Sequence, residues 1–190
     1  MWPTRIAAQE ALSKAAPTSS MSMDGFEMPP FSQSRKNLGP WIPDKLWSQV
    51  KRYMSIPCVD VLLENPRGEI LLGWRQIPPY KDVWALPGGR VGKGEQLQTT
   101  ARRILAEYGL AAREFYLVGI FPMKFPTRSD FPVCVAARYP RGEASPDYME
   151  FSTFHWIRQL PKGLGANYRR MIAQWSKIKS KPEILRFNRL

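Results

Sequence analysis

Residues 85–110 read ALPGGRVGKGEQLQTTARRILAEYGL, a glycine-rich turn followed by a helix-forming segment. From Leu97 onward the apolar residues recur with the 3.6-residue period of an amphipathic helix, and Gly109 is placed to end it in a left-handed conformation. The polar face of this helix ends in the carboxylate of Glu107. A basic glycine turn beside such a carboxylate can hold a divalent cation against a diphosphate.

On both sides of this stretch, short apolar segments typical of strands alternate with two further helical patterns. Pro43 and Asp44 suit the first turn of a helix. The predicted strands cover 58–63, 69–75, 115–121, 131–138 and 151–157, with a hairpin turn at 65–68, and the two further helices cover 44–54 and 167–177. This order favours an α+β sandwich over an array of βαβ units.

Length and charge limit the classes of protein to consider. With 190 residues, 44% of them apolar, the chain fits one domain with tails: a tail at 1–40 that we expect to be disordered, a folded domain at 41–177 and a basic tail at 178–190. The net charge of +12 favours phosphate-bearing partners such as nucleotides or nucleic acid, although a generally basic surface without such a partner explains it equally well.

The two cysteines, Cys58 and Cys134, lie in apolar segments, so we expect reduced core thiols. The sequence contains no apolar run of the roughly 20 residues that a membrane span needs. The first 30 residues lack the apolar block of a secretory signal. We therefore expect a cytoplasmic protein, with an organelle-targeting peptide as the open alternative.

The turn and helix resemble the signature of the Nudix hydrolases, which places a Gly, a Glu and the run Arg-Glu-apolar-x-Glu-Glu-x-Gly at fixed spacings. The matching positions are Gly89, Glu95, Arg103 and Glu107. Ile104 stands where the signature has its first helix glutamate, and the segment ends one residue early, so the usual glutamate pair is reduced to one residue.

Both departures are shared by the GDP-mannose mannosyl hydrolases, to which residues 60–110 are similar. This resemblance implies a Nudix-type α/β/α sandwich with a mixed central sheet. It also implies Mg²⁺-dependent release of a nucleoside diphosphate and a free sugar from a nucleotide sugar. A homodimer, to which the helix at 44–54 could contribute, is implied as well.

Candidate metal ligands follow from the same comparison. Mg²⁺ prefers oxygen ligands and is typically held by one or two carboxylates together with substrate phosphates. The resemblance assigns ligation to Glu107, to the backbone carbonyl of Gly88 and to a strand position occupied here by Glu150. An ion pair between Glu107 and Arg103, one helical turn away, is the alternative role, and both can hold at once.

Two arginines and one acid are the candidate substrate contacts. Guanidinium groups stabilise the charge that develops on a leaving diphosphate. The resemblance places Arg75 and Arg90 near the diphosphate and Asp60 at the nucleotide-sugar site. Asp60 lies within an apolar strand, where an acid is costly without a partner, so a structural pairing with an arginine is the alternative.

The general base is the part of the family pattern that this chain lacks. In the mannosyl hydrolases it is a histidine, whose position is occupied here by Phe151. Strand alternation predicts that His155 shares a face with Phe151 but lies roughly 13 Å away, so a structural role is expected for it. Water would then be activated by Glu150 or by the metal, and attack on the sugar carbon is favoured over attack on phosphorus.

Two other functions remain open. One is a Nudix-like module that binds nucleotides or RNA without catalysis, through Arg102, Arg103, Arg169, Arg170 and the C-terminal lysines. The other is a Nudix hydrolase that cleaves a different nucleoside diphosphate derivative at phosphorus.

Overall fold

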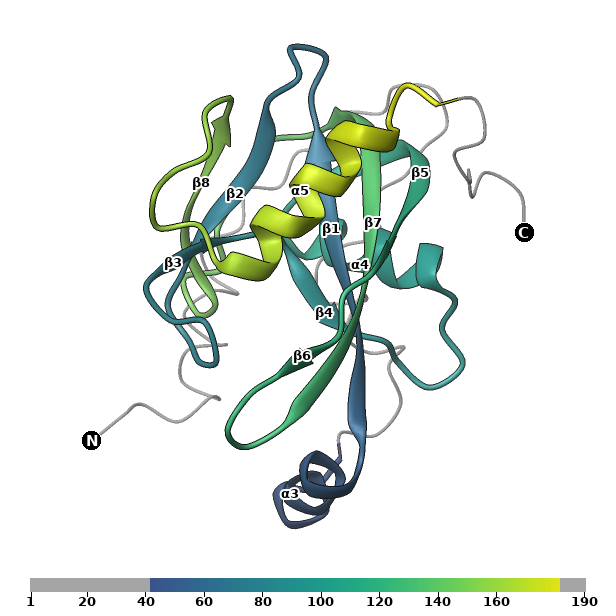
Figure 1. Ribbon diagram of the computed structural model, residues 1–190, viewed down its shortest axis with the longest axis vertical. Helices are drawn as coiled ribbons and strands as arrows, with labels where there is room; N and C mark the ends of the chain where they lie inside the picture. The colour runs from purple at the N-terminus through teal and green to yellow at the C-terminus, as the bar shows by residue number, and fades with distance from the viewer. Residues whose placement is uncertain (1–41, 182–190) are drawn as a thin grey trace, which may run out of the picture.

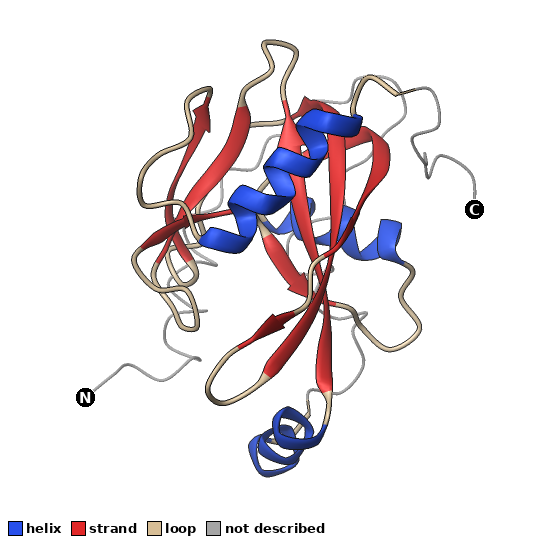
Figure 2. Cartoon of the chain, in the orientation of Figure 1, coloured by secondary structure: helices blue, strands red, loops and turns tan. Residues whose placement is uncertain are grey.

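The computed structural model describes residues 42–181. The predicted tail at 1–40 lies outside the described residues, as do residues 182–190 of the predicted C-terminal tail. One eight-stranded mixed sheet lies between helices α4 and α5, and a third helix, α3, lies beyond one end of the sheet (Figure 1). This is the α+β sandwich that the order of elements predicts, and Figure 2 shows its helical and strand layers.

The observed elements follow the predicted ones closely where the sequence is periodic. The helices are α3 (Asp44–Tyr53), α4 (Leu97–Glu107) and α5 (Ala166–Ile178). The strands are β1 (Ser55–Glu64), β2 (Ile70–Arg75), β3 (Val83–Ala85), β4 (Gly88–Arg90), β5 (Ala111–Ile120), β6 (Met123–Lys124), β7 (Ser129–Arg141) and β8 (Phe151–Ile157). Gly109 has a φ of +71°, which confirms the left-handed end of α4.

The sheet runs in the order β3-β2-β1-β7-β5, with β8 paired to β2, β4 to β1 and β6 to β7. β1 and β7 are parallel along the whole of β1, and the other pairs are antiparallel. β1 pairs with β2 at Glu64, whereas Cys58 to Asp60 pair with Arg90 to Gly88 of β4. β1 therefore changes its antiparallel neighbour along its length, and this change brings the glycine segment beside Asp60.

The two helices bury complementary stripes against the sheet. α4 buries Thr100, Ala101, Ile104 and Leu105, and α5 buries Asn167, Tyr168, Met171, Ile172 and Trp175. Between them, residues 59–63 of β1 are buried without interruption, as expected for a strand that is covered on both faces.

Glu64 ends this buried stretch of β1. Its carboxylate accepts hydrogen bonds from Lys179 Nζ at 2.5 Å and from Trp175 Nε1 at 3.3 Å, which satisfies a buried acid. Lys179, assigned to the basic tail by the sequence, thus packs onto the folded domain.

Three short strands differ from the sequence-based prediction. The double glycine predicted to form a turn lies in β4, where it pairs with β1. β3, which pairs with β2, and β6, which pairs with β7, are not among the predicted strands. Strands of two or three residues are too short to show a hydrophobic period, and paired glycines ordinarily indicate a turn.

Among the described helices, none combines the length and apolarity that a membrane span requires.

Candidate active site

The site is organised around the guanidinium of Arg103 on α4. Its Nε donates to Glu95 Oε1 at 2.9 Å, its Nη2 to Glu95 Oε2 at 3.0 Å and its Nη1 to Glu107 Oε1 at 2.9 Å. Nη2 also donates to the carbonyl oxygen of Arg90 at 2.8 Å. One side chain therefore holds the loop before α4, the end of α4 and strand β4 in a fixed arrangement.

Glu95 shapes the loop that leads into α4. Its Oε2 also accepts from the Gly92 amide at 2.8 Å and from Thr100 Oγ1 at 3.0 Å. Burial acts to raise the pKa of Glu95, but the hydrogen bonds from Arg103 and Gly92 outweigh it and lower the pKa below its ordinary value. Glu95 is thus a charged structural anchor at neutral pH.

Glu107 ends α4 beside the glycine strand. The predicted ion pair with Arg103 is confirmed, and it engages only Oε1 among the described contacts of this carboxylate. Arg103 Nη1 also lies 4.0 Å from the point where a side chain at Gly89 would begin. The second oxygen of Glu107 therefore stays available as a hard ligand close to the glycine segment, a donor type that suits Mg²⁺.

Asp60 lies on β1 directly opposite Gly88 of β4. A Cβ at position 88 would overlap Asp60 Oδ1, so glycine is required there for the two strands to approach. Asp60 is 7% exposed and its Oδ2 is buried without a hydrogen-bond partner. Burial raises the pKa of Asp60 to about 7, against a lowering effect of the positive charge of Arg75.

Arg75, at the end of β2, is ion-paired with Glu150 through Nη1 and Oε1. Its Nε donates to the carbonyl of Ile77 at 3.2 Å, and its guanidinium lies 5.9 Å from the ring centre of Phe151. Asp147 Oδ1 accepts from the amide of Glu150 at 2.9 Å and so fixes the turn that presents this acid. A cation at Glu150 would have to share the carboxylate with Arg75.

Aromatic packing connects the two predicted carboxylate ligands. Tyr108 follows Glu107, Phe151 follows Glu150, and the two rings meet edge to face at 5.6 Å. The C-terminal end of α4 and the start of β8 are therefore in contact through these two rings. Phe151, which stands where the resemblance to the mannosyl hydrolases implies a histidine, is fully buried in the core.

The position predicted for His155 is wrong. A β-bulge between Gly73 and Arg75 places Phe151 and Phe154 opposite these two residues of β2, so Phe151 and Phe154 share one face of β8. His155 pairs with Leu72 on the other face, where its ring packs edge to face on Trp84 at 5.5 Å and bonds Thr153 Oγ1 at 3.1 Å. These contacts are those of a structural residue.

Arg90 extends toward α3. Its guanidinium lies 4.4 Å from the ring centre of Trp47, a cation–π arrangement. A diphosphate bound by Arg90 would therefore lie near the helix that precedes β1. Its strand partner Cys58 and the buried Cys134 are both free thiols, as expected. Burial raises the pKa of Cys58 to about 12, which makes it unreactive.

Three residues near Asp60 were not predicted. Asp130 on β7 is 5% exposed, is held by Arg128 Nη2 at 2.8 Å and raises the pKa of Asp60 through its charge. Burial, with a contribution from the charge of Asp60, raises the pKa of both Tyr80 and Tyr168. Sequence patterns carry no signal for this group because it depends on the parallel pairing of β1 with β7 and on the packing of α5.

No group of three or more His, Cys, Asp and Glu side chains within residues 42–181 could share a metal ion. The predicted magnesium site would accordingly rest on Glu107 and the Gly88 carbonyl, with Glu150 as a third donor.

This fold, with its glycine strand and with Arg103 bound to one loop carboxylate and one helix carboxylate, is that of a known family. The NUDIX domain family matches residues 54–174, and the chain belongs to it.

Two sequence relatives and one solved structure show how far the similarity extends. The NAD-capped RNA hydrolase NudC of Vibrio cholerae is 34% identical over 109 residues, which cover 55% of this chain and 39% of that protein. The RNA pyrophosphohydrolase of Caulobacter vibrioides is 49% identical over 53 residues, covering 27% of this chain and 30% of that protein. The chain thus spans well under half the length of these relatives.

The MutT protein from Methanosarcina mazei Go1 superposes with a TM-score of 0.60 at 21% identity, over 67% of this chain and 96% of that one. At this identity the likeness supports the fold.

Proposed function

We propose that this chain is a Mg²⁺-dependent hydrolase of a nucleoside diphosphate derivative. The observation that supports this most directly is the carboxylate of Glu107, held beside the glycine strand by Arg103 with one oxygen left for a ligand. Bound there with the Gly88 carbonyl and Glu150, Mg²⁺ would supply a Lewis acid for the diphosphate oxygens.

The substrate we favour is a nucleotide sugar resembling GDP-mannose. Support comes from the shortened signature, which leaves one glutamate at the end of α4 instead of a cluster. Water would attack the anomeric carbon, the bond from that carbon to the diphosphate oxygen would break, and nucleoside diphosphate and sugar would leave. Arg75 would hold the diphosphate with Arg90, and Asp60 would contact the substrate from β1, between β4 and β7.

The second candidate is hydrolysis at phosphorus of the diphosphate at the 5′ end of an RNA. It is favoured by the two sequence relatives, whose names describe hydrolases of NAD-capped RNA and of RNA pyrophosphate. The net charge of +12 suits such a polyanion. A Nudix module that binds these ligands without turning them over is the non-catalytic alternative.

Product identification separates these possibilities. The full chain would be incubated with Mg²⁺ and, in turn, GDP-mannose, GDP-glucose, NAD and a 5′-triphosphorylated RNA. Nucleoside diphosphate plus sugar indicates attack on carbon, whereas monophosphate products indicate attack on phosphorus. Absence of turnover for every substrate would refute the enzymatic proposal and leave the binding module.

A further inference from the structure

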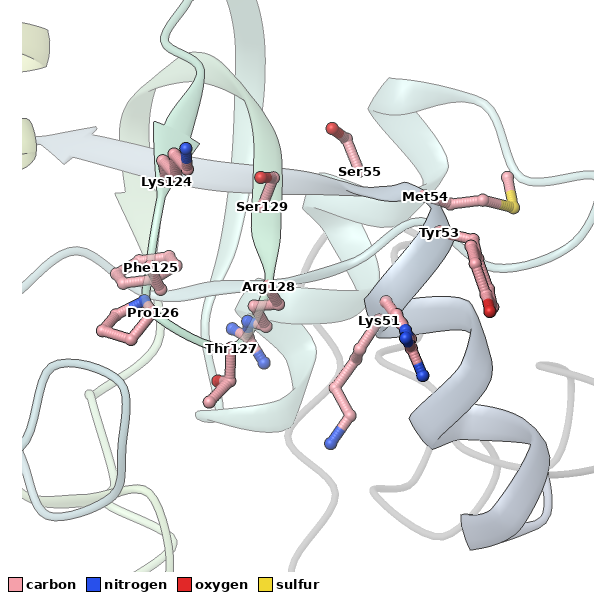
Figure 3. A pocket seen from close by; sticks show the side chains of 11 residues that line it. Lys51, Tyr53, Met54, Ser55, Lys124, Phe125, Pro126, Thr127, Arg128 and Ser129 are labelled. Atoms are coloured by element: carbon pink, nitrogen blue, oxygen red, sulfur yellow. The ribbon is translucent and has the colours of Figure 1, made fainter.

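A second concave surface lies outside the proposed hydrolytic site, between the end of α3 and the hairpin that joins β6 to β7. It has a volume of about 580 Å³ (Figure 3). Lys51 and Arg52 line it from the helix side, and Lys124 and Arg128 line it from the hairpin side. We call this surface the α3–hairpin groove.

The charge of the groove has one sign. Its 11 lining residues include four cations and no carboxylate. Asp130, which follows the lining residue Ser129, is buried and paired with Arg128 at 2.8 Å. The lysines and Arg52 are not engaged in this pair, so an excess of positive charge remains on both walls.

The rest of the lining suits a phosphate chain with bases. Ser55 and Ser129, the first paired residues of β1 and β7, also line the groove and supply hydroxyl donors. Two aromatic side chains also line it: Tyr53, which is 74% exposed and has the guanidinium of Arg52 5.5 Å from its ring centre, and Phe125, which has that of Arg128 at 5.7 Å. Cations, hydroxyls and aromatic faces along a groove are the combination that binds single-stranded nucleic acid.

We propose that the α3–hairpin groove binds single-stranded nucleic acid, with its phosphates between Lys51 and Lys124. The groove is concave and has positive charge on two facing walls. A single-stranded nucleic acid can enter a surface of this shape, whereas a flat bilayer cannot. Asp60 lies five residues along β1 from Ser55, which is about 17 Å at the rise of a strand. A single-stranded nucleic acid held in the groove can therefore reach toward the proposed hydrolytic site. This role does not depend on hydrolysis.

The test is binding of a fluorescein-labelled oligouridine of about 12 nucleotides, a length within the usual site sizes. Anisotropy would be measured without Mg²⁺ at several salt concentrations for the full chain, for K51Q/K124Q and for the control K162Q/K177Q. The control removes two exposed lysines near and on α5 and gives the same net charge. Circular dichroism would verify that the variants are folded.

We expect K51Q/K124Q to weaken binding at least about tenfold and to reduce the magnitude of the salt slope by about 1.4, from about 0.7 per lost phosphate contact. The control is expected to bind like the unaltered chain. Equal binding by the two double variants, or no saturable binding by the unaltered chain, would overturn the proposal. The proposal would also be overturned if polyglutamate at equal charge concentration displaced the RNA. Binding of phosphatidylserine vesicles at equal charge concentration that is lost in K51Q/K124Q would overturn it as well.

The E107Q variant keeps this test separate from the proposed function. Because Glu107 lies outside the groove, its replacement should leave oligouridine binding unchanged. If the chain binds oligouridine but hydrolyses no substrate, only the proposed function fails. If it hydrolyses a substrate but does not bind oligouridine, only the groove proposal fails.

Discussion

At the scale of single residues, Arg103 makes the contacts on which the geometry of the site depends. Removal of its guanidinium takes the donated hydrogen bonds from Glu107 and from the Arg90 carbonyl, and leaves Glu95 with only its donors Gly92 and Thr100. We expect R103A to lower the free energy of unfolding by roughly 3 kcal/mol, the usual cost of breaking a buried pair. Urea denaturation would measure this effect.

The neighbouring Arg102 provides the matched control. It is exposed, and its guanidinium lies 5.5 Å from the ring centre of Phe115. R102A should cost less than about 1 kcal/mol. Equal effects of R102A and R103A would contradict the central position given to Arg103.

The raised pKa of Asp60 predicts that the free energy of unfolding depends on pH. Its pKa rises from 3.8 to about 7 on folding, so between these values the folded chain keeps a proton that the unfolded chain has released. The contribution of the Asp60 carboxyl to the free energy of unfolding is therefore largest below about pH 4, and it is lost as the pH rises to about 7. Asn cannot ionise, so D60N should gain stability relative to the unaltered chain across this window.

At about 1.4 kcal/mol per pKa unit, the gain of D60N reaches roughly 4 kcal/mol at most. Unfolding free energies measured between about pH 5 and pH 8 in EDTA would show it, with the exposed Asp82→Asn variant as the reference. A D60N curve parallel to that of the unaltered chain would show that Asp60 is not desolvated.

Sequence reasoning at this scale succeeded where contacts are local. The spacing of Arg103 and Glu107 along one helix is sufficient to predict their ion pair. It failed for His155, because one bulge in β8 reverses the alternation on which the prediction depended. The group of Asp130, Tyr80 and Tyr168 around Asp60 comes from distant parts of the chain and has no local pattern.

At the scale of elements, the close approach of β4 to β1 is the feature most sensitive to a single methyl group. A side chain at position 88 would overlap the carboxylate of Asp60 and come within 3.3 Å of the Val59 carbonyl. G88A should destabilise the chain by roughly 1–3 kcal/mol. Thermal and urea unfolding would measure this effect.

Gly163 gives the comparison, because a Cβ there would make ordinary contacts of 3.8 Å with Trp74 and Trp84. G163A is expected to be nearly neutral. The double variant D60A/G88A should recover part of the stability lost in G88A, since the overlapping oxygen is gone. Strict additivity of the two substitutions would show that the strands do not meet at this point.

The long elements were predictable because their hydrophobic periods extend over many residues. α5 was predicted at 167–177 and observed at Ala166–Ile178, and β8 agrees at both ends. β3, β4 and β6 were not predictable, because strands of two or three residues are defined by their partners.

At the scale of the whole molecule, the parallel pairing of β1 with β7 determines which distant residues meet. It places Ser55 beside Ser129 and Asp60 beside Cys134. The fold class was predictable from the order of elements, but this register was not, since the paired segments are more than 70 residues apart. The α3–hairpin groove also depends on this pairing, which places Ser55 beside Ser129. The composition of the chain indicated an excess of positive charge but not where it lies.

The most direct test of the proposed chemistry is the rate of Mg²⁺-dependent hydrolysis by E107Q, measured as kcat/KM on the best substrate of the panel. The matched control is E143Q, which neutralises an exposed glutamate in the loop after β7. We predict that E107Q loses at least about 100-fold while E143Q keeps the rate of the unaltered chain. An E107Q variant that hydrolyses the substrate as fast as E143Q, with the same Mg²⁺ requirement, would contradict the assignment of the metal to the end of α4.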